Sequence, residues 1–377
     1  MKAGDVKKIM SHKWTRINTN KDKPVIRVHS CLFAAQTGFF RFLIAAAFFC
    51  AAATGAPRDW AKYPVVTQIA SAEEIFAIGD AHSDFRRLAR AMAAARILEA
   101  QPLKPEDAHW RAGHAVLVTT GDMIDKGPRA LDVLRLLMLL RTEARRAGGD
   151  VVILAGNHEA EFLADPAAPK GREFAKQLKA ANIDVAEVGA CKGEIGEFLC
   201  SLSFEARVGD WFFSHGGNAG GRNVEQLTAD LQGGIEHEGF RTKHLIGDDS
   251  ILESRLNGEG RRPWIDAGVP DRGERELLAD YARALGVEHF VEGHVPSEVV
   301  FADGVKRNRG EMFQRFGLLF LIDTGMSEGV DDSGGAVLHI TYRGGEKATA
   351  ICPDGKSTLL WDDVTKPNMG RATACVK

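Results

Sequence analysis

Six short apolar runs, most of them ending at a glycine, constrain the fold of this 377-residue chain more than any other feature. Such runs, rich in β-branched and aromatic residues, are typical of buried strands. They are EIFAIG (74–79), AVLVTTG (115–121), VVILAG (151–156), WFFSHGG (211–217), HFVEG (289–293) and LLFLID (318–323). The sequence therefore predicts a largely buried sheet.

Helix-forming stretches alternate with these runs. Residues 85–100 and 129–146 repeat apolar side chains at helical spacing, which predicts amphipathic helices that cover the sheet. Residues 336–361 alternate in polarity and contain Gly-Gly and Asp-Gly turns, which predicts antiparallel hairpins. Residues 165–200 and 218–275 are less regular, and we expect loops there that lie over the strand ends. The fold class is α/β.

The first 55 residues differ from the rest. A basic stretch is followed from Phe42 by the uncharged run FLIAAAFFCAAATGAP, which is shorter than the ~20 residues that a spanning helix needs. This pattern predicts a signal peptide or an N-terminal anchor over 1–55, with a linker over 56–72. A buried helix of the mature fold is the alternative. We expect an exported protein, periplasmic or envelope-associated, that touches a membrane only through an uncleaved N-terminal segment.

The charge balance limits the kind of partner. The chain has a net charge of −3, and residues 1–55 hold nine basic and two acidic side chains, which leaves −10 for the remainder. An acidic domain lacks the broad basic field of a nucleic-acid binder, so no nucleic-acid partner is expected.

Four cysteines follow the N-terminal segment, and no two of them form a CxxC pair, which disfavours a zinc knuckle. They are Cys191, Cys200, Cys352 and Cys375. In an oxidising compartment they could pair as neighbours, although four cysteines allow three pairings. Unpaired thiols are an equally open alternative.

Polar residues follow five of the predicted strands, where loops at the carboxyl ends of strands converge. They are Asp80 and His82 after the first strand, Asp122 and Asp125 after the second, Asn157, His158 and Glu159 after the third, His215 after the fourth and His294 after the fifth. Any one of these loops could be a helix cap. Helix caps would not require four histidines and an asparagine with the same strand-then-glycine pattern, so a shared site is the stronger hypothesis.

Oxygen and imidazole ligands without thiolates suit Mn, Fe or Zn. So many ligands accommodate two cations more easily than one. A pair of cations needs a bridging carboxylate and can generate a hydroxide for in-line attack on phosphorus. Asp122 is the natural bridge.

The ordered motifs GDAH, GDMIDKG, GNHE, HGG and GH resemble those of the calcineurin-like metallophosphoesterases, in their phosphoprotein phosphatase branch. SILESR (250–255) and LIDTGMS (321–327) are similar to the bacterial Shewanella-like protein phosphatases. The resemblance covers roughly residues 73–345. It implies a β-sandwich flanked by helices in α/β/β/α layers, a catalytic domain over 73–345, and a β extension over 346–377 packed on the same domain.

The resemblance also implies roles for single residues. The two divalent cations, Mn before Fe or Zn, would be held by Asp80, His82, Asp122, Asn157, His215 and His294. Asp80 and His82 would hold the first, Asp122 would bridge, and the other three would complete the second site. His158 would be the general acid, because a phosphoester leaving group needs a proton, and Asp125 would orient its ring.

Two positions depart from the family pattern. Ser83 stands where the family has glycine, which is tolerable if its backbone angles are ordinary. Lys126 stands where the family has arginine, and a lysine cannot give the planar two-pronged contact of a guanidinium. Either Lys126 binds phosphate as a point charge with Asn157 beside it, or Arg255 takes that role. Arg129 is a second candidate, although a place on the helix surface suits it better.

The sequence thus predicts a metal-dependent phosphoric monoester hydrolase that acts on phosphorylated protein, with Ser/Thr and Tyr both open, or on small phosphoesters. A phosphodiesterase or dinucleoside polyphosphate hydrolase on the same scaffold is the alternative. A non-catalytic metal-binding scaffold protein is a remote third reading.

Overall fold

The computed structural model describes residues 58–256, 264–266, 273–365 and 372–375. The chain divides after Ala52, and the second unit contains every described residue. The predicted signal peptide or anchor over 1–55 lies outside the described residues. Within the described part of the chain, no helix is long and apolar enough to span a bilayer.

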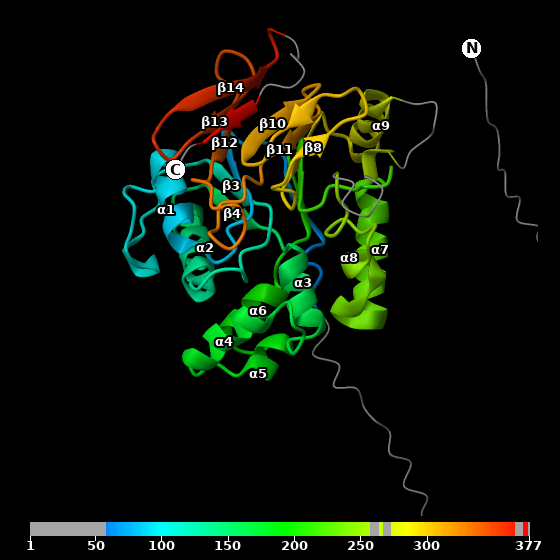
Figure 1. Ribbon diagram of the computed structural model, residues 1–377. Helices are drawn as coiled ribbons and strands as arrows, with labels where there is room; N and C mark the ends of the chain where they lie inside the picture. The colour runs from blue at the N-terminus through cyan, green and yellow to red at the C-terminus, as the bar shows by residue number, and fades with distance from the viewer. Residues whose placement is uncertain (1–57, 257–263, 267–272, 366–371, 376–377) are drawn as a thin grey trace, which may run out of the picture. The chain divides into compact units, whose positions relative to one another are not determined.

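Two β-sheets form the centre of this unit (Figure 1). The six-stranded sheet has the order β14 (Ser357–Asp362), β13 (Lys347–Ile351), β12 (Val337–Thr341), β2 (Glu74–Ile78), β3 (Val116–Thr119) and β4 (Asp150–Ile153). The seven-stranded sheet has the order β1 (Val66–Ile69), β5 (Glu205–Val208), β6 (Trp211–Ser214), β7 (His289–Glu292), β11 (Leu319–Leu321), β10 (Glu311–Arg315) and β15 (Ala372–Ala374). A small ribbon pairs β8 (Val299–Val300) with β9 (Lys306–Arg307).

All six predicted runs form strands. The predicted linker over 56–72 also contains a strand, β1, which pairs in parallel with β5. β1 has four residues and only one buried side chain, so its sequence shows little of the alternation that predicts a strand. Its pairing with β5 identifies it as a strand.

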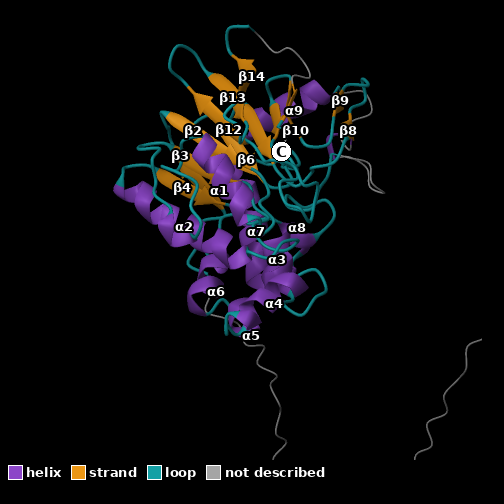
Figure 2. Ribbon diagram, turned by 60° about the vertical axis from the view of Figure 1, so that its left-hand side comes forward, coloured by secondary structure: helices purple, strands orange, loops and turns teal. Residues whose placement is uncertain are grey.

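Alternation along β2 explains the layered arrangement. Ile75 and Ala77 pack in the core between the two sheets, whereas Phe76 and Ile78 join the core beneath the helices. Helices α1 (Phe85–Ala94) and α2 (Ala130–Arg146) cover the outer face of the β2–β3–β4 region (Figure 2). Both faces of these central strands are therefore buried, as the layered α/β class requires.

Among the described residues, seven further helices follow, and five of them, α4 to α8, lie within residues 165–200 and 218–275, where the sequence predicted loops, so that prediction was wrong. They are α3 (Asn157–Ala164), α4 (Arg172–Ala180), α5 (Val185–Gly189), α6 (Gly193–Cys200), α7 (Val224–Glu238), α8 (Lys243–Ile246) and α9 (Glu274–Leu285), with 3-10 turns at Pro105–Asp107, Gly239–Arg241 and Trp264–Asp266. Most are short and bury only a few side chains, such as Phe174 and Leu178 of α4. Side-chain caps start three of them, with Asp184 at α5, Thr242 at α8, and a capping box of Asn223 and Gln226 at α7.

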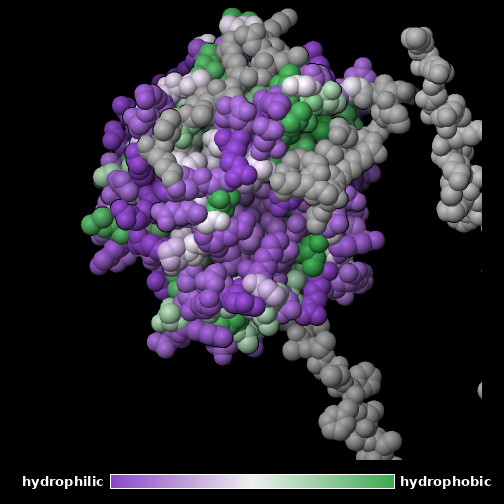
Figure 3. Space-filling model, viewed as in Figure 1, coloured by the Kyte–Doolittle hydropathy of each residue, from purple (hydrophilic) through white to green (hydrophobic). Residues whose placement is uncertain are grey.

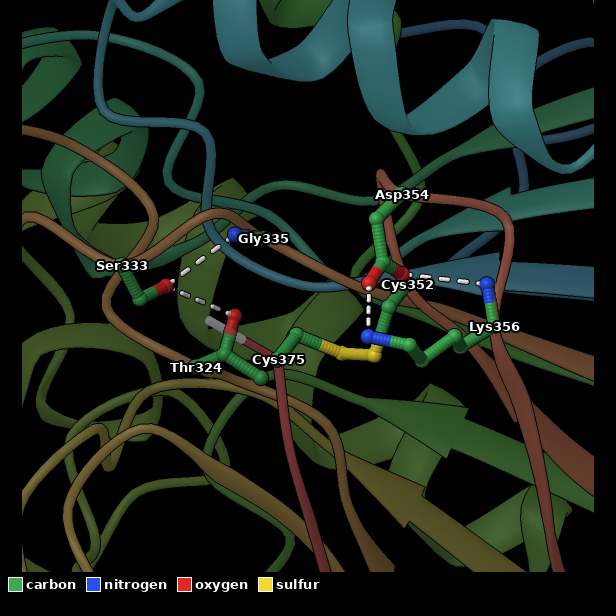
Figure 4. The surroundings of a disulfide bond; sticks show 7 residues. All are labelled: Thr324, Ser333, Gly335, Cys352, Asp354, Lys356 and Cys375. Carbon is green, nitrogen blue, oxygen red and sulfur yellow. Dashed lines mark hydrogen bonds and ion pairs between the residues drawn. A yellow bond between two sulfur atoms is a disulfide. The ribbon is translucent and has the colours of Figure 1, made fainter. Parts of the chain in front are cut away.

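Both disulfides join neighbouring cysteines. Cys191–Cys200 closes a short loop around α6, and Cys352–Cys375 links the end of β13 to the segment after β15. The second bond therefore connects the two sheets. Figure 4 shows it between the Asp354–Lys356 turn and the group formed by Thr324, Ser333 and Gly335.

The surface in Figure 3 is mainly hydrophilic, with isolated apolar residues. Large exposed apolar side chains among the described residues include Leu103 and Val364. Scattered single residues of this kind are ordinary on a folded protein.

Candidate metal centre

The polar residues predicted to share a site meet at one end of the sandwich. Loops after β2, β3 and β4 of one sheet and after β6 and β7 of the other supply them. The site therefore takes its residues from both sheets. All nine predicted residues are buried to 4% exposure or less, namely Asp80, His82, Asp122, Asp125, Asn157, His158, Glu159, His215 and His294.

Asp122 lies at the centre of the cluster. Its Oδ2 is 3.5 Å from His82 Nε2, and its Oδ1 is 3.4 Å from His215 Nε2. It belongs to two groups of close ligand atoms, one with His82 and His158 and one with His215 and His294. Burial would raise the pKa of Asp122, but His215 and His158 hold it well below its usual value. A carboxylate shared between two imidazole groups fits the bridging position of a dinuclear centre.

Asp80 faces the same space from β2. Its carboxylate accepts the backbone N–H of His294 and lies 4.0 Å from His82 Nε2 and from His215 Nδ1. Burial and the nearby Asp323 raise the pKa of Asp80 well above its ordinary value. A divalent cation would relieve this repulsion, so the acidic groups fit a bound metal.

Asp323 was missed by the sequence analysis. It follows β11 within the quoted LIDTG stretch, is fully buried, and has an Oδ2 atom without a hydrogen-bond partner among the described residues. The end of β2 packs so closely on it that a Cβ at Gly79 would lie 2.9 Å from its Cα. An aspartate directly after a predicted strand was the signal that could have found it.

Two contacts orient the imidazole and amide ligands. His215 Nδ1 lies 2.8 Å from the carbonyl of Thr120, which turns Nε2 toward Asn157 Oδ1 at 3.1 Å. The Asn157 amide donates to Glu253 Oε1 at 2.9 Å and so presents its oxygen to the site. Supporting contacts of this kind fix metal ligands in other proteins.

The pKa values of His215 and His294 shift in opposite directions. Burial lowers the pKa of His215, but Asp122 and Asp80 outweigh burial and raise it to about 10. A cation that binds here would displace that proton. His294 Nε2 has no hydrogen-bond partner among the described residues, and burial with His215 nearby holds the pKa of His294 well below its usual value. A buried, neutral imidazole with a free nitrogen can bind a metal ion.

His158 has the geometry of a positioned proton donor. Its Nδ1 lies 3.0 Å from Asp125 Oδ2, and Asp125 Oδ1 accepts the backbone N–H of Phe174 at the start of α4. His158 Nε2 faces the centre, 3.9 Å from Asp122 Oδ2. The carboxylate thus fixes the ring while the other nitrogen points at the reacting space.

Glu159 organises the loop that bears Asp122. Its two carboxylate oxygens accept backbone N–H bonds from Gly156, Asp122, Met123 and Ile124 at 2.8–3.1 Å. Burial and Asp122 raise its pKa to about 7. Glu159 was predicted at the strand end without a role, although its three-residue spacing from Gly156 was a capping signal.

A cavity of about 300 Å³ opens onto the cluster. Lys126 and Arg255, the two candidate phosphate ligands, both line it. Lys170 and Arg309 line it too and were missed, because nothing in their local sequence marks them. Lys170 pairs with Glu253, and Arg309 pairs with Asp331 at 2.6 Å. Arg129 is not among the residues that line this cavity and instead pairs with Asp132 on α2.

The backbone is left-handed at several site residues. Asp122, Asp125 and Lys126 have φ values of 50°, 62° and 56°, and such angles at non-glycine residues cluster at functional sites. Ser83 has a φ of 62°. Serine would replace the family's glycine without cost only if its backbone angles were ordinary, and those of Ser83 are not.

Comparison with known proteins agrees with this site. A family model described as calcineurin-like phosphoesterase matches residues 74–298. An uncharacterized protein of Schizosaccharomyces pombe is 29% identical over 276 residues, which cover 70% of this chain and 74% of that protein. Shewanella-like protein phosphatase 2 of Arabidopsis thaliana is 33% identical over 93 residues, which cover 25% of this chain and 22% of that protein.

A solved structure shares the fold. The cold-active protein-tyrosine phosphatase of a psychrophilic Shewanella species superposes with a TM-score of 0.58 at 18% identity, covering 79% of this chain and 82% of that one. The family model spans more than half of the chain, and its region contains every predicted metal ligand. The chain belongs to the calcineurin-like phosphoesterase family.

Proposed function

We propose that the protein is a metal-dependent phosphomonoesterase that removes phosphate from phosphorylated proteins or small phosphoesters. The observation that carries the proposal is the His158–Asp125 pair, which faces two ligand groups that share Asp122. Two divalent cations, when bound, supply the Lewis-acid chemistry that activates water for attack on phosphorus. Mn²⁺ suits the oxygen and imidazole donors, and Fe and Zn suit them as well.

The side chains divide the remaining work. Lys126, Asn157 and Arg255 all line the cavity, which supports a role for them in binding the phosphoryl oxygens. His158 gives its Nε2 proton to the leaving oxygen, and Asp125 stabilises the charged ring before that transfer. One small cationic cavity suits a single phosphoryl group better than a bridged diester.

A substrate panel with the full-length protein tests this function. In the presence of Mn²⁺, Zn²⁺ or Fe²⁺, hydrolysis of p-nitrophenyl phosphate should exceed that of bis-p-nitrophenyl phosphate by at least about 10-fold in kcat/KM. Peptides with phosphoserine, phosphothreonine and phosphotyrosine then define the preferred residue. Faster cleavage of the diester or of a dinucleoside polyphosphate would establish the phosphodiesterase alternative. No turnover with any metal would favour the alternative of a non-catalytic metal-binding scaffold protein.

Asp122→Asn tests the bridging role, because removal of a shared charge should cost at least about 100-fold in kcat. Asp132→Asn is the matched control, since Asp132 pairs with Arg129 on the surface of α2. A loss below about 10-fold in Asp122→Asn would contradict the mechanism.

We also propose that the protein is exported. The basic and apolar segment over 1–55 supports this, as do two disulfides in the domain that follows. Fractionation of cells that express the full-length chain should find the active protein in the periplasm or envelope.

A further inference from the structure

A second group of ligand-type side chains lies at the opposite end of β7 from the catalytic centre. Glu288, His289 and Glu346 each offer one ligand atom, and these atoms lie within 4.8 Å of one another. His289 begins β7, and His294 follows the end of the same strand. Five residues of strand separate them by about 16 Å, so the two sites are distinct.

The ring of His289 is fixed as a neutral ligand would be. Its Nδ1 lies 2.5 Å from the carbonyl oxygen of Gly317 and donates to it, which leaves the lone pair on Nε2. The side chain is 4% exposed. Within the described residues, Nε2 has no hydrogen-bond partner. A buried nitrogen acceptor without a donor costs free energy unless something binds it.

The carboxylates face this nitrogen. Glu346 Oε2 lies 3.8 Å from His289 Nε2. That distance is too long for a hydrogen bond, yet it approaches the ~3.4 Å between two ligands of a tetrahedral zinc ion with bonds of about 2.0–2.2 Å. Glu346 Oε1 accepts the Trp211 indole N–H at 2.6 Å, which holds the group toward the ring. Glu288 is exposed and closes the site from the solvent side.

Two tryptophans form the walls. Trp211 stacks on the His289 ring at 4.1 Å, and Trp361 meets it edge-on at 4.6 Å. Asp210, whose carbonyl accepts the N–H groups of Glu288 and His289, adds a further acidic residue to this region. Imidazole nitrogen and carboxylate oxygen are both ligand types that Zn²⁺ accepts, and three protein ligands leave a fourth position for water.

We propose that Glu288, His289 and Glu346 bind a Zn²⁺ ion that is separate from the catalytic metals. Glu346 lies between β12 and β13 of the six-stranded sheet, and His289 lies in the seven-stranded sheet. The ion would therefore join the two sheets at the end remote from catalysis. Its effect would be on stability, because metal that binds only the folded state stabilises that state.

His289→Asn is the informative variant. The asparagine amide can still donate to the Gly317 carbonyl, but it has no atom in place of Nε2. His339→Asn is the matched control, because His339 is also a strand histidine, paired with Glu74 and stacked on Phe76. His339 is not part of any group of ligand atoms found among the described residues.

The test uses the full-length protein dialysed against Zn²⁺, followed by metal analysis and thermal melts with and without Zn²⁺. Wild type and His339→Asn should bind one more Zn²⁺ per chain than His289→Asn. Zn²⁺ should raise Tm less in His289→Asn than in the other two, with phosphatase activity kept. Co²⁺ should quench the fluorescence of Trp211 and Trp361 in wild type and less in His289→Asn.

Equal zinc content and equal Zn²⁺-dependent Tm in wild type and His289→Asn would overturn the proposal. The contact between His289 and Glu346 would then be an ion pair without a metal. If His289→Asn does not fold, Glu288→Gln decides, since its exposed side chain tolerates replacement. Loss of this ligand should weaken zinc binding at the site at least about 10-fold. Unchanged zinc affinity in that variant would also overturn the proposal.

Discussion

Ser83 shows how one residue can hold a conformation that its neighbours impose. Its backbone N–H donates to the carbonyl of Met123, its φ is 62°, and its hydroxyl has no partner among the described residues. A Cβ in this region of backbone space costs about 1–2 kcal/mol. The loop between β2 and α1 therefore carries strain that a glycine would not.

Ser83→Gly should raise the free energy of unfolding by about 0.5–1 kcal/mol, because relief of that strain exceeds the entropy that glycine adds to the unfolded chain. Urea unfolding followed by circular dichroism measures the change. Ser201→Gly is the control and should lower stability, since Ser201 caps α6 with ordinary angles. Equal losses in both variants would show that no strain is stored at Ser83.

Arg255 and Lys126 pose a different residue-scale question, namely which of them binds phosphate. Both line the cavity, but Lys126 is exposed and Arg255 is half-buried. A guanidinium can contact two phosphoryl oxygens at once and loses less to solvent screening when half-buried.

Arg255→Gln should lower kcat/KM for p-nitrophenyl phosphate about 100-fold, and Lys126→Gln should lower it less than about 10-fold. The apparent Ki of inorganic phosphate should rise in the same order. Arg129→Gln is the control, because Arg129 pairs with Asp132 outside the cavity and should keep full activity. A larger loss in Lys126→Gln would make the lysine the phosphate ligand.

At the level of strands, three neighbours in the seven-stranded sheet form a row of buried polar groups. Glu205 of β5 lies opposite Ser214 of β6, which lies opposite Glu292 of β7. Both oxygens of Glu205, the Ser214 hydroxyl and one oxygen of Glu292 have no hydrogen-bond partner among the described residues. Burial raises the pKa of Glu205 to about 8, so its neutral form is the one that the fold accepts.

Glu205 should therefore make stability depend on pH. Its folded-state pKa lies above the usual 4.5, so the stability that its neutral form contributes is complete below pH 4.5 and is lost as pH rises toward 8. Between pH 5 and pH 8.5, the free energy of unfolding should fall by about 4 kcal/mol less in Glu205→Gln than in wild type. Urea unfolding at several pH values measures this, with the surface variant Glu225→Gln as control. Parallel pH curves for Glu205→Gln and wild type would contradict the assignment.

Element-scale features also show what the sequence could and could not predict. The strand-end motifs were predictable because each ligand lies within a few residues of its own strand. The strand β1 was not, because it depends on pairing with the distant β5, and the helices α4, α5 and α6 were not, because their 9, 5 and 8 residues are too few for a helical period to show. Lys170 and Arg309 could not be predicted either, because nothing in their local sequence marks them, whereas Asp323 directly follows a predicted strand and could have been found. The need for glycine at Gly217, the second glycine of HGG, was also not predictable from the sequence, since it arises because a Cβ there would overlap the Glu292 carboxylate.

At the scale of the whole molecule, the catalytic centre depends on how the two sheets are held together. One sheet supplies Asp80, Asp122 and Asn157, and the other supplies His215 and His294. The disulfide Cys352–Cys375 is a covalent link between these sheets, and it lies beside the Thr324–Ser333 contact in the loop after Asp323 (Figure 4). Cys191–Cys200 joins only the ends of α6 within one helical region.

Removal of the two disulfides should therefore have unequal effects. Loop-closure entropy gives about 3.4 kcal/mol for the bond that spans 23 residues and about 2.7 kcal/mol for the bond that spans 9. Cys352→Ser with Cys375→Ser should lose the larger amount, and it should also lower metal affinity, because the two halves of the ligand set are less firmly joined. Cys191→Ser with Cys200→Ser is the matched pair and should keep metal affinity. Urea unfolding and Mn²⁺ titration measure both quantities, and equal metal affinity in the two double variants would show that packing between the sheets alone holds the centre together.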